Sequence, residues 1–308
     1  MSGPLIALTG ATGFIGRHLL TALSARGYRV RVLLRRPVEV PEGASSAVVG
    51  DLARPINMAA GLSGVDAVVH SAGLAQAMSG APEDDFRSSN TEATRRLAEA
   101  AHRARVRRFV FLSSVRAQTG PSAPEPIAET DAPEPTDAYG RSKLAAEQAL
   151  AQTGLDWVAL RPALVYGAGV KGNMAALLSL ARSPYPLPLA SLSGRRSLVS
   201  VESLSTAVAT VLQAAGPLDR PLIVADPDPL SLPEMLSALR SGLGRRAGLV
   251  PVPTPLVGLV CRMTGRGEIF DRLSGSLIAR SDELAALGWR PAQASPDGLA
   301  ALARNSAA

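Results

Sequence analysis

Two side chains in the middle of the chain have the types and spacing needed for proton transfer. Tyr139 and Lys143 lie four residues apart in a segment with helical spacing, YGRSKLAAEQAL, so they share one helix face. A tyrosine has a pKa of about 10, and a nearby ammonium group or a positive nicotinamide ring favours its ionised form. The pair could exchange a proton with a hydroxyl or ketone oxygen while a hydride moves to or from a nicotinamide. Ser114, at the expected tip of an apolar strand, is placed to hydrogen-bond that same oxygen.

A glycine-rich turn near the N-terminus predicts where a dinucleotide binds. Residues 5–8 form an apolar run typical of a strand buried on both faces, and a helical pattern follows the turn. Glycines spaced as Gly10, Gly13 and Gly16 allow a tight turn, close approach of a pyrophosphate, and close packing of helix on strand. The helix N-terminus adds free N–H groups and a partial positive charge. The alternative is a glycine-rich turn without a ligand. The contacts predicted here are Gly10, Thr12, Gly13, Phe14 and Ile15.

Two arginines bear on the type of dinucleotide. Arg35 and Arg36 directly follow a second expected strand at residues 29–34. A site for NAD(H) normally has a carboxylate here for the ribose 2′-hydroxyl, whereas guanidinium groups pair with a 2′-phosphate. We therefore favour NADP(H) over NAD(H); the alternative is that both arginines are surface residues on a loop. Further cofactor contacts are predicted after the third and fourth strands and in the catalytic helix: Asp51, Leu52, Ser71, Ala72, Gly73, Tyr139 and Lys143.

Alternating strands and helices in the first half of the chain predict an α/β fold with a Rossmann-type, doubly wound parallel sheet. Strands are expected at residues 5–8, 29–34, 47–49, 66–70, 109–112 and 156–160. Helices are expected at residues 90–105, 139–150, 204–213 and 232–243. We assign residues 1–165 to this dinucleotide-binding domain and 166–308 to a smaller C-terminal substrate domain. A later segment near 195–225, with a strand at 222–225, is expected to return to the first domain.

Composition and charge exclude several classes of protein. Of the 308 residues, 46% are hydrophobic and 19% charged, as in globular domains, and the net charge is +6. The densest basic run, residues 102–108, has no interleaved aromatic residue, so we expect a solvated helix end and no nucleic-acid binding. The single cysteine, Cys261, excludes an internal disulfide and fits a reducing compartment.

The sequence has neither a long apolar segment nor a set of metal ligands, and this bears on localisation and metal binding. The chain has no apolar run of about 18 residues, and we expect no signal peptide, so we predict a cytoplasmic protein without stable membrane insertion. His70 has no second histidine or cysteine at ligand spacing, so we predict no metal site and expect His70 to be packed at a strand end.

Four motifs together carry a resemblance to a known family. TGATGFIG at 9–16, FLSS at 111–114, YGRSK at 139–143 and LRPALVYG at 160–167 resemble the extended short-chain dehydrogenase/reductases, the NAD(P)-dependent nucleotide-sugar epimerase/dehydratase family. The resemblance continues through GNM at 172–174, RRSLVSVESL at 195–204 and LGWRP at 287–291. It implies catalysis by Ser114, Tyr139 and Lys143. It also implies a homodimer that pairs the helices at 90–105 and 139–152. The residues it implies for a substrate diphosphate are Asn173 and Arg196, with Arg272 a weaker candidate.

Within that family, the chain is most similar to enzymes of surface-polysaccharide synthesis that act at C4 of UDP-linked hexoses. The favoured function is NADPH-dependent reduction of the C4 ketone of a UDP-linked 4-keto-hexose, acetamido-dideoxy sugars included. The alternative is an NAD-dependent UDP-hexose 4-epimerase with the same triad, although such epimerases usually carry an acidic residue where Arg35 and Arg36 stand. A dehydratase would need an Asp-Glu pair beside the serine, where this chain has Val115 and Arg116.

Two non-catalytic functions are further alternatives. A NAD(P)-sensing regulator on the same fold typically lacks the tyrosine–lysine pair, which this chain retains. Leu256, Leu259, Val260 and Met263 form an apolar helical stripe that could meet a membrane surface. Packing of such a stripe onto the substrate domain is the more common role.

Overall fold

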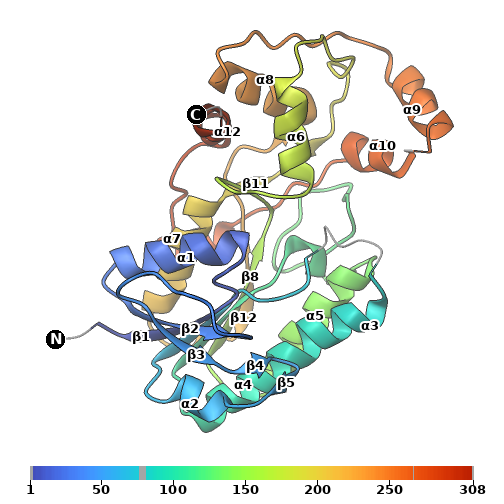
Figure 1. The fold of residues 1–308 in the computed structure, drawn as a ribbon. Helices are drawn as coiled ribbons and strands as arrows, with labels where there is room; N and C mark the ends of the chain where they lie inside the picture. The colour runs from blue at the N-terminus through green and yellow to red at the C-terminus, as the bar shows by residue number, and fades with distance from the viewer. Residues whose placement is uncertain (1–2, 76–80, 266, 307–308) are drawn as a thin grey trace.

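A seven-stranded parallel sheet forms the centre of the computed structural model, which describes residues 3–75, 81–265 and 267–306 (Figure 1). The strand order is β12-β8-β7-β6-β1-β2-β3. Because every neighbouring pair is parallel, all carboxyl ends lie at one edge of the sheet. From β1 the sheet grows in opposite directions through β2 and β6, which is where doubly wound folds bind ligands. The strands are β1 Leu5–Thr9, β2 Arg29–Leu34, β3 Ser45–Val48, β6 Ala67–His70, β7 Arg108–Leu112, β8 Trp157–Pro162 and β12 Arg220–Val224.

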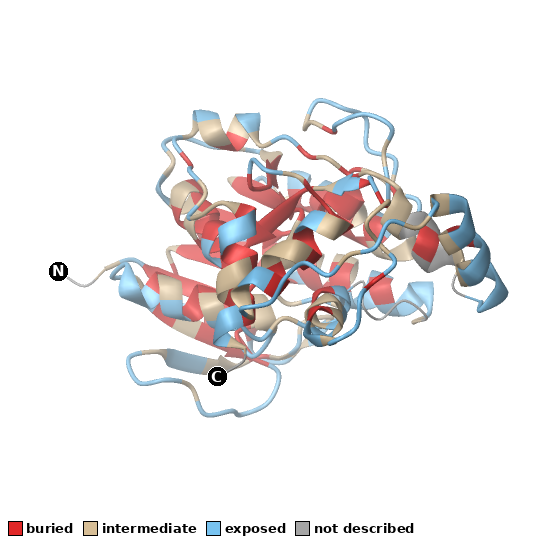
Figure 2. Cartoon of the chain, turned by 90° about the horizontal axis from the view of Figure 1, so that it is seen from above, coloured by how far each residue is buried: buried red, intermediate tan, exposed pale blue. Residues whose placement is uncertain are grey.

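Helices cover both faces of this sheet, so its central strands are buried on both sides (Figure 2). In β1, Ile6 and Leu8 pack into the cluster that contains α1 and α7, whereas Leu5 and Ala7 pack into the opposite cluster with α2, α4 and α5. This two-sided burial explains the continuous apolar runs. It confirms the predicted Rossmann-type α/β fold. The helices are α1 Phe14–Ala25 and α7 Val201–Gln213 on one face, and α2 Met58–Leu62, α4 Ala93–Arg103 and α5 Ala138–Ala151 on the other.

The later part of the chain builds a third apolar cluster, at the top of Figure 1. Its main helices are α6 Asn173–Arg182, α8 Leu232–Gly242 and α12 Ser295–Asn305. Two short strand pairs lead into it: β9 Leu164–Tyr166 with β11 Leu198–Ser200, and β10 Arg195–Arg196 with β13 Leu230–Ser231. In the same stretch of chain, β12 pairs with β8 and adds the last strand of the main sheet. The domain boundary at 165/166 stays a prediction.

Some elements differ from the sequence-based prediction. The helix expected to begin at residue 90 is preceded by α3 Glu83–Phe86 and a π-helical turn, η2 Arg87–Glu92. Three acidic residues, Glu83, Asp84 and Asp85, favour a helix start at this earlier point because they face its positive end. The third strand covers 45–48, and the last begins at Arg220. The remaining short elements are β4 Gly50–Asp51, β5 Arg54–Pro55, η3 Val115–Ala117, α9 Thr254–Met263, α10 Gly267–Ser274 and α11 Asp282–Ala286.

The apolar stripe near the C-terminus is exposed. Leu256, Leu259, Val260 and Met263 are 54 to 79% exposed on α9, whose other face contacts α10 through Gly258 and Phe270. The expectation that this stripe packs onto the substrate domain is therefore wrong, because α9 turns its smaller residues inward. None of the helices among the described residues has the length and hydropathy that a membrane crossing requires.

Candidate functional site

The glycine turn has the shape of a pyrophosphate cradle. Gly10 has a φ of +72°, and a Cβ there would come within 2.7 Å of the Ala72 nitrogen. At Gly16 a Cβ would lie 2.0 Å from the Gly10 carbonyl oxygen. The first turn of α1 has no side-chain cap and no acidic residue, so its N–H groups and positive dipole are available to an anion. These features fit the phosphates of a dinucleotide.

A chain of hydrogen bonds joins the ends of β1 and β6 beside this cradle. The Thr9 hydroxyl accepts bonds from the backbone N–H groups of Ser71 (3.2 Å) and Ala72 (3.1 Å), so its own proton goes to His70 Nδ1 (2.7 Å). His70 Nε2 then donates to the Thr94 hydroxyl (3.0 Å). Burial, reinforced by the charge of Lys143, lowers the pKa of His70 to about 3. The imidazole is therefore neutral and holds residues 71–73 at the carboxyl edge.

Ser114 and Tyr139 come together at the ends of β7 and α5. Ser114 follows the tip of β7 and Tyr139 lies in the first turn of α5, and the two side chains are close enough for Ser114 to lower the pKa of Tyr139. The Tyr139 ring meets Phe86 of α3 edge-on, with the ring centroids 6.1 Å apart. Burial raises the pKa of Tyr139, and the neighbouring Ser114 side chain opposes this increase. The serine and tyrosine are thus arranged to share one substrate oxygen.

Lys143 lies behind Tyr139 in a buried position. Its Nζ donates to the Leu112 carbonyl (2.9 Å), sits 4.7 Å from the Phe111 ring centroid and is 6.0 Å from that of Tyr139. Burial lowers the pKa of Lys143 to about 8, against the opposing charge of Glu147. The structure therefore brings the three predicted catalytic residues together, but the charge that favours the Tyr139 phenolate here comes from Arg116.

The predicted contacts to the adenosine half of a dinucleotide lie at the same edge of the sheet. Arg35 and Arg36 follow β2, and both are exposed. Neither side chain forms a hydrogen bond or ion pair with another described residue. Asp51 is exposed in β4, where its carboxylate caps the Ala53 N–H (2.8 Å), and Leu52 is half-buried. All four side chains are placed where a ligand at the carboxyl edge could reach them, and their roles stay predictions.

The predicted substrate residues come from the later part of the chain. Asn173 is exposed at the first position of α6. Arg196 is half-buried and donates to the Pro121 carbonyl (3.0 Å). It also lines a small cavity together with Val115, the neighbour of Ser114. Arg195 points elsewhere, toward the Pro229 carbonyl and Glu234. The side chain of Arg272 lies outside the described part of the structure.

Sequence reasoning missed a set of buried polar residues that supports the site. Asn90, 1% exposed, bonds both backbone groups of Leu74 and the Ser142 hydroxyl. Glu147 and Arg161 form a buried ion pair (2.5 Å), to which Ser113 donates a further hydrogen bond. A glutamate inside a helix that also carries Tyr139 and Lys143 was the available signal, but its partner is 14 residues away on β8.

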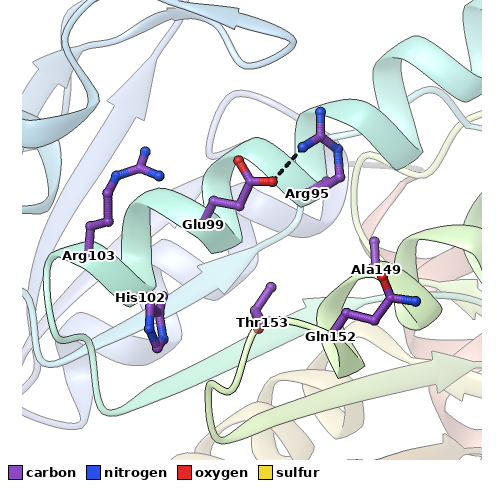
Figure 3. Close-up of a pocket in the computed structure, with 7 residues that line it drawn as sticks. All are labelled: Arg95, Glu99, His102, Arg103, Ala149, Gln152 and Thr153. Carbon is purple, nitrogen blue, oxygen red and sulfur yellow. Dashed lines mark hydrogen bonds and ion pairs between the residues drawn. The ribbon is translucent and has the colours of Figure 1, made fainter.

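A surface pocket between α4 and α5 is separate from this site (Figure 3). It lies at the C-terminal ends of both helices, whereas Tyr139 lies at the start of α5. Its lining residues are Arg95, Glu99, His102, Arg103, Ala149, Gln152 and Thr153. Within the described ranges, no group of three or more His, Cys, Asp or Glu side chains could hold a metal ion.

Comparisons with known proteins agree with this geometry. A model of the NAD dependent epimerase/dehydratase family matches residues 6–224. The UDP-glucose 4-epimerase of Vibrio cholerae is 33% identical over 304 residues, which cover 95% of this chain and 92% of that protein. The ceramide reductase of Caulobacter vibrioides is 28% identical over 302 residues, 94% of this chain and 87% of that protein. The solved structure of MoeE5 in complex with UDP-glucuronic acid and NAD has a TM-score of 0.78 and 26% identity, and covers 99% of both chains.

Proposed function

This chain belongs to the NAD-dependent epimerase/dehydratase family of enzymes, and we propose that it catalyses oxidation or reduction at C4 of a UDP-linked hexose. The observation that carries the proposal is the approach of Ser114 to Tyr139, with the buried Lys143 ammonium 6.0 Å from the centroid of the tyrosine ring. A UDP-sugar is supported by the Vibrio cholerae relative and by MoeE5, whose names specify UDP-linked sugars. A nicotinamide dinucleotide is the cofactor.

The residues of the triad divide the proton chemistry between them. When bound, the nicotinamide dinucleotide would supply the hydride in its reduced form, NAD(P)H, and accept it in its oxidised form, NAD(P)+. Tyr139 gives its proton to the C4 oxygen during reduction and takes it back during oxidation. Ser114 hydrogen-bonds the same oxygen and holds it in line with the tyrosine hydroxyl. Lys143 is proposed to hydrogen-bond the cofactor ribose, while the charge of Arg116 favours the Tyr139 phenolate.

The specific reaction we propose is NADPH-dependent reduction of a 4-keto-hexose. Arg35 and Arg36, exposed just past β2, support NADPH because they could pair with its 2′-phosphate. Val115 and Arg116, instead of an Asp-Glu pair beside Ser114, argue against dehydration. Asn173 and Arg196 are proposed to contact the diphosphate of the substrate.

A 4-epimerase is the second candidate, and the Vibrio cholerae relative favours it. An epimerase uses the same triad, but it must keep its cofactor bound and return the hydride to the other face of the sugar. A reductase instead releases oxidised cofactor after each turnover. The two functions therefore differ in cofactor retention and in net consumption of NADPH.

The test combines both differences in one preparation. The purified protein is examined for retained cofactor, then incubated with UDP- and dTDP-linked 4-keto-sugars and NADPH or NADH while absorbance is followed. We expect NADPH to be consumed with a UDP-linked ketone. Tyr139→Phe should lower kcat by about 100-fold or more while NADPH still binds, because only the transferred proton is lost. Tightly held NAD, interconversion of UDP-hexoses and no net NADPH consumption would establish the epimerase instead.

We also propose that the chain forms a homodimer through the surface of α4 and α5. The half-buried Arg95–Glu99 pair and the pocket of Figure 3 lie on this surface. Sedimentation velocity would distinguish a dimer from a monomer.

A further inference from the structure

An ion pair joins the turn that carries Ser114 to the helix start that carries Tyr139. Arg116 Nη2 lies 2.5 Å from Asp137 Oδ2, and Arg116 is only 6% exposed. The backbone N–H of Arg116 donates to the Ser114 hydroxyl (3.1 Å). Asp137 caps α5 by accepting from the Gly140 N–H through Oδ1 (2.7 Å). The ion pair is thus attached by short hydrogen bonds to both sides of the proton-transfer site.

The two segments are also in direct van der Waals contact. A Cβ at Gly140 would lie 2.2 Å from the Arg116 carbonyl oxygen, so only glycine allows this approach. A continuous set of contacts therefore runs from Ser114 through Arg116 and Asp137 to the first turn of α5, which carries Tyr139. Any change in the ion pair therefore acts directly on the relative placement of the two hydroxyl groups.

The charges of the pair act on Tyr139 in opposite directions. Asp137 raises the pKa of Tyr139 and Arg116 lowers it. Arg116 Nε and Nη1 are buried and have no hydrogen-bond partner among the described residues. The positive charge of the buried guanidinium group is therefore balanced mainly by the Asp137 carboxylate. The other charged groups near Tyr139 are Lys143 on the same helix and the exposed Glu83–Arg141 pair between α3 and α5. Neutral His70 lies beyond Lys143.

We propose that Arg116 and Asp137 form a positioning pair that sets the proton affinity of the Tyr139 hydroxyl and so the pH range of the enzyme. The inference rests on the proposed function, in which Tyr139 transfers the proton. Without the charge of Arg116, the Asp137 carboxylate is no longer opposed by its ion-pair partner and disfavours the phenolate. Without the charge of Asp137, the guanidinium is likewise unopposed and favours the phenolate. Removing both charges cancels most of each effect.

The test is the pH dependence of kcat/KM for ketone reduction, which falls as Tyr139 loses its proton. We expect Arg116→Gln to move the alkaline midpoint upward by about one pH unit and Asp137→Asn to move it downward by about one. The double variant should lie near the wild type. Asparagine keeps an oxygen for the Gly140 N–H, so Asp137→Asn preserves the helix cap. Shifts in the same direction, or none in either variant, would overturn the proposal.

Two further variants separate a charge effect from a loss of structure. Arg116→Lys keeps the positive charge and should return the midpoint close to that of the wild type. Asp156→Asn breaks a comparable Arg108–Asp156 pair (2.6 Å) at the other end of β7, and should lower stability without moving the midpoint. A midpoint that moves equally in Asp156→Asn would mean that the shift reflects general destabilisation.

A direct titration keeps this inference separate from the proposed function. The tyrosinate absorbance of each variant is followed with pH, and the same titration of a Tyr139→Phe background is subtracted. Opposite shifts of the titration midpoint in Arg116→Gln and Asp137→Asn would support the role of the pair, even if no UDP-linked ketone were reduced. The absence of ketone reduction would then refute only the proposed substrate. Turnover with unshifted absorbance and pH profiles would refute only the role of the pair.

Discussion

His70 joins the end of β6 to the end of β1 and to helix α4 through its two ring nitrogens. Nδ1 accepts a hydrogen bond from the Thr9 hydroxyl, whose oxygen itself accepts bonds from two backbone N–H groups. Nε2 donates a hydrogen bond to Thr94. The ring also stacks on Phe111, beneath the Lys143 ammonium. A charged imidazole would lose the Thr9 bond and face a like charge. Protonation of His70 would therefore disturb the hydrogen bonds that hold Thr9 and the backbone of Ser71 and Ala72 in place.

This arrangement predicts a pH dependence of stability. Burial lowers the pKa of His70 from 6.5 to about 3, so below pH 6.5 the unfolded chain binds a proton that the native state rejects. Stability is therefore lost as the pH falls from 6.5 toward 3, by about 2 kcal/mol at roughly pH 5. We expect His70→Gln to be less stable than the wild type at neutral pH. Between about pH 7 and pH 5, however, its free energy of unfolding should fall by about 2 kcal/mol less than that of the wild type.

Urea unfolding of both proteins at the two pH values measures this difference. The change in the free energy of unfolding between the two pH values is compared for the two proteins. Carboxylates contribute equally to both changes, so their contribution cancels in the comparison. Parallel losses would mean that His70 is protonated in the folded protein.

At the scale of elements, the strand–turn–helix unit β1–α1 depends on contacts that leave no room for a side chain. Gly16 brings α1 against the Gly10 carbonyl, and Gly10 brings β1 against the residues after β6. The uncapped first turn of α1 then points its N–H groups to the carboxyl edge. The proposed cofactor site is therefore formed mainly by closely packed backbone and less by side chains.

Gly16→Ala should abolish NADPH binding because its Cβ, 2.0 Å from the Gly10 oxygen, must push the turn apart. The overpacking should also lower stability by about 1–3 kcal/mol. Gly64→Ala is the matched control: its φ of +67° makes alanine strained, but no atom lies within 4 Å of the new Cβ. NADPH binding by fluorescence should survive in Gly64→Ala, and survival in Gly16→Ala would show that the turn is not the cofactor site.

At the scale of the whole molecule, the sheet and the later part of the chain serve different ligands in our proposal. The glycine turn, Arg35 and the triad all lie on elements of the central sheet or its helices. Asn173 and Arg196 come from segments after β8, and Arg196 reaches back to Pro121 and the cavity beside Val115. Substrate and cofactor affinities should therefore be separable by mutation.

Arg196→Gln should raise KM for the UDP-sugar by about tenfold or more, because a charge-assisted bond to the diphosphate is lost. The Kd for NADPH should not change. Arg195→Gln is the control, since Arg195 is adjacent in sequence but contacts the Pro229 carbonyl (3.0 Å) and Glu234 (3.2 Å). Steady-state kinetics and NADPH binding measure both effects. Equal KM changes in the two variants would remove Arg196 from the proposed diphosphate site.

Local patterns in the sequence determined the elements of the sheet, the glycine turn and the spacing of Tyr139 and Lys143. Each of these depends on neighbours within a few residues: an apolar run, a glycine at a tight turn, or one turn of helix. The start of the helix at 90–105 was misplaced although its signal is also local, in the three acidic residues of the first turn of α3, whereas the distant partners of Asn90, Leu74 and Ser142, depend on the fold.

Only the tertiary structure decided which buried groups surround the proposed proton-transfer site. The Arg116–Asp137 pair spans 21 residues and Glu147–Arg161 joins a helix to a strand. It likewise decided which arginine of the 195–196 pair faces Val115, and that the stripe on α9 is exposed. Sequence spacing does not specify such partners, because a charge is compensated by whichever group the packed sheet and helices bring within a few ångströms.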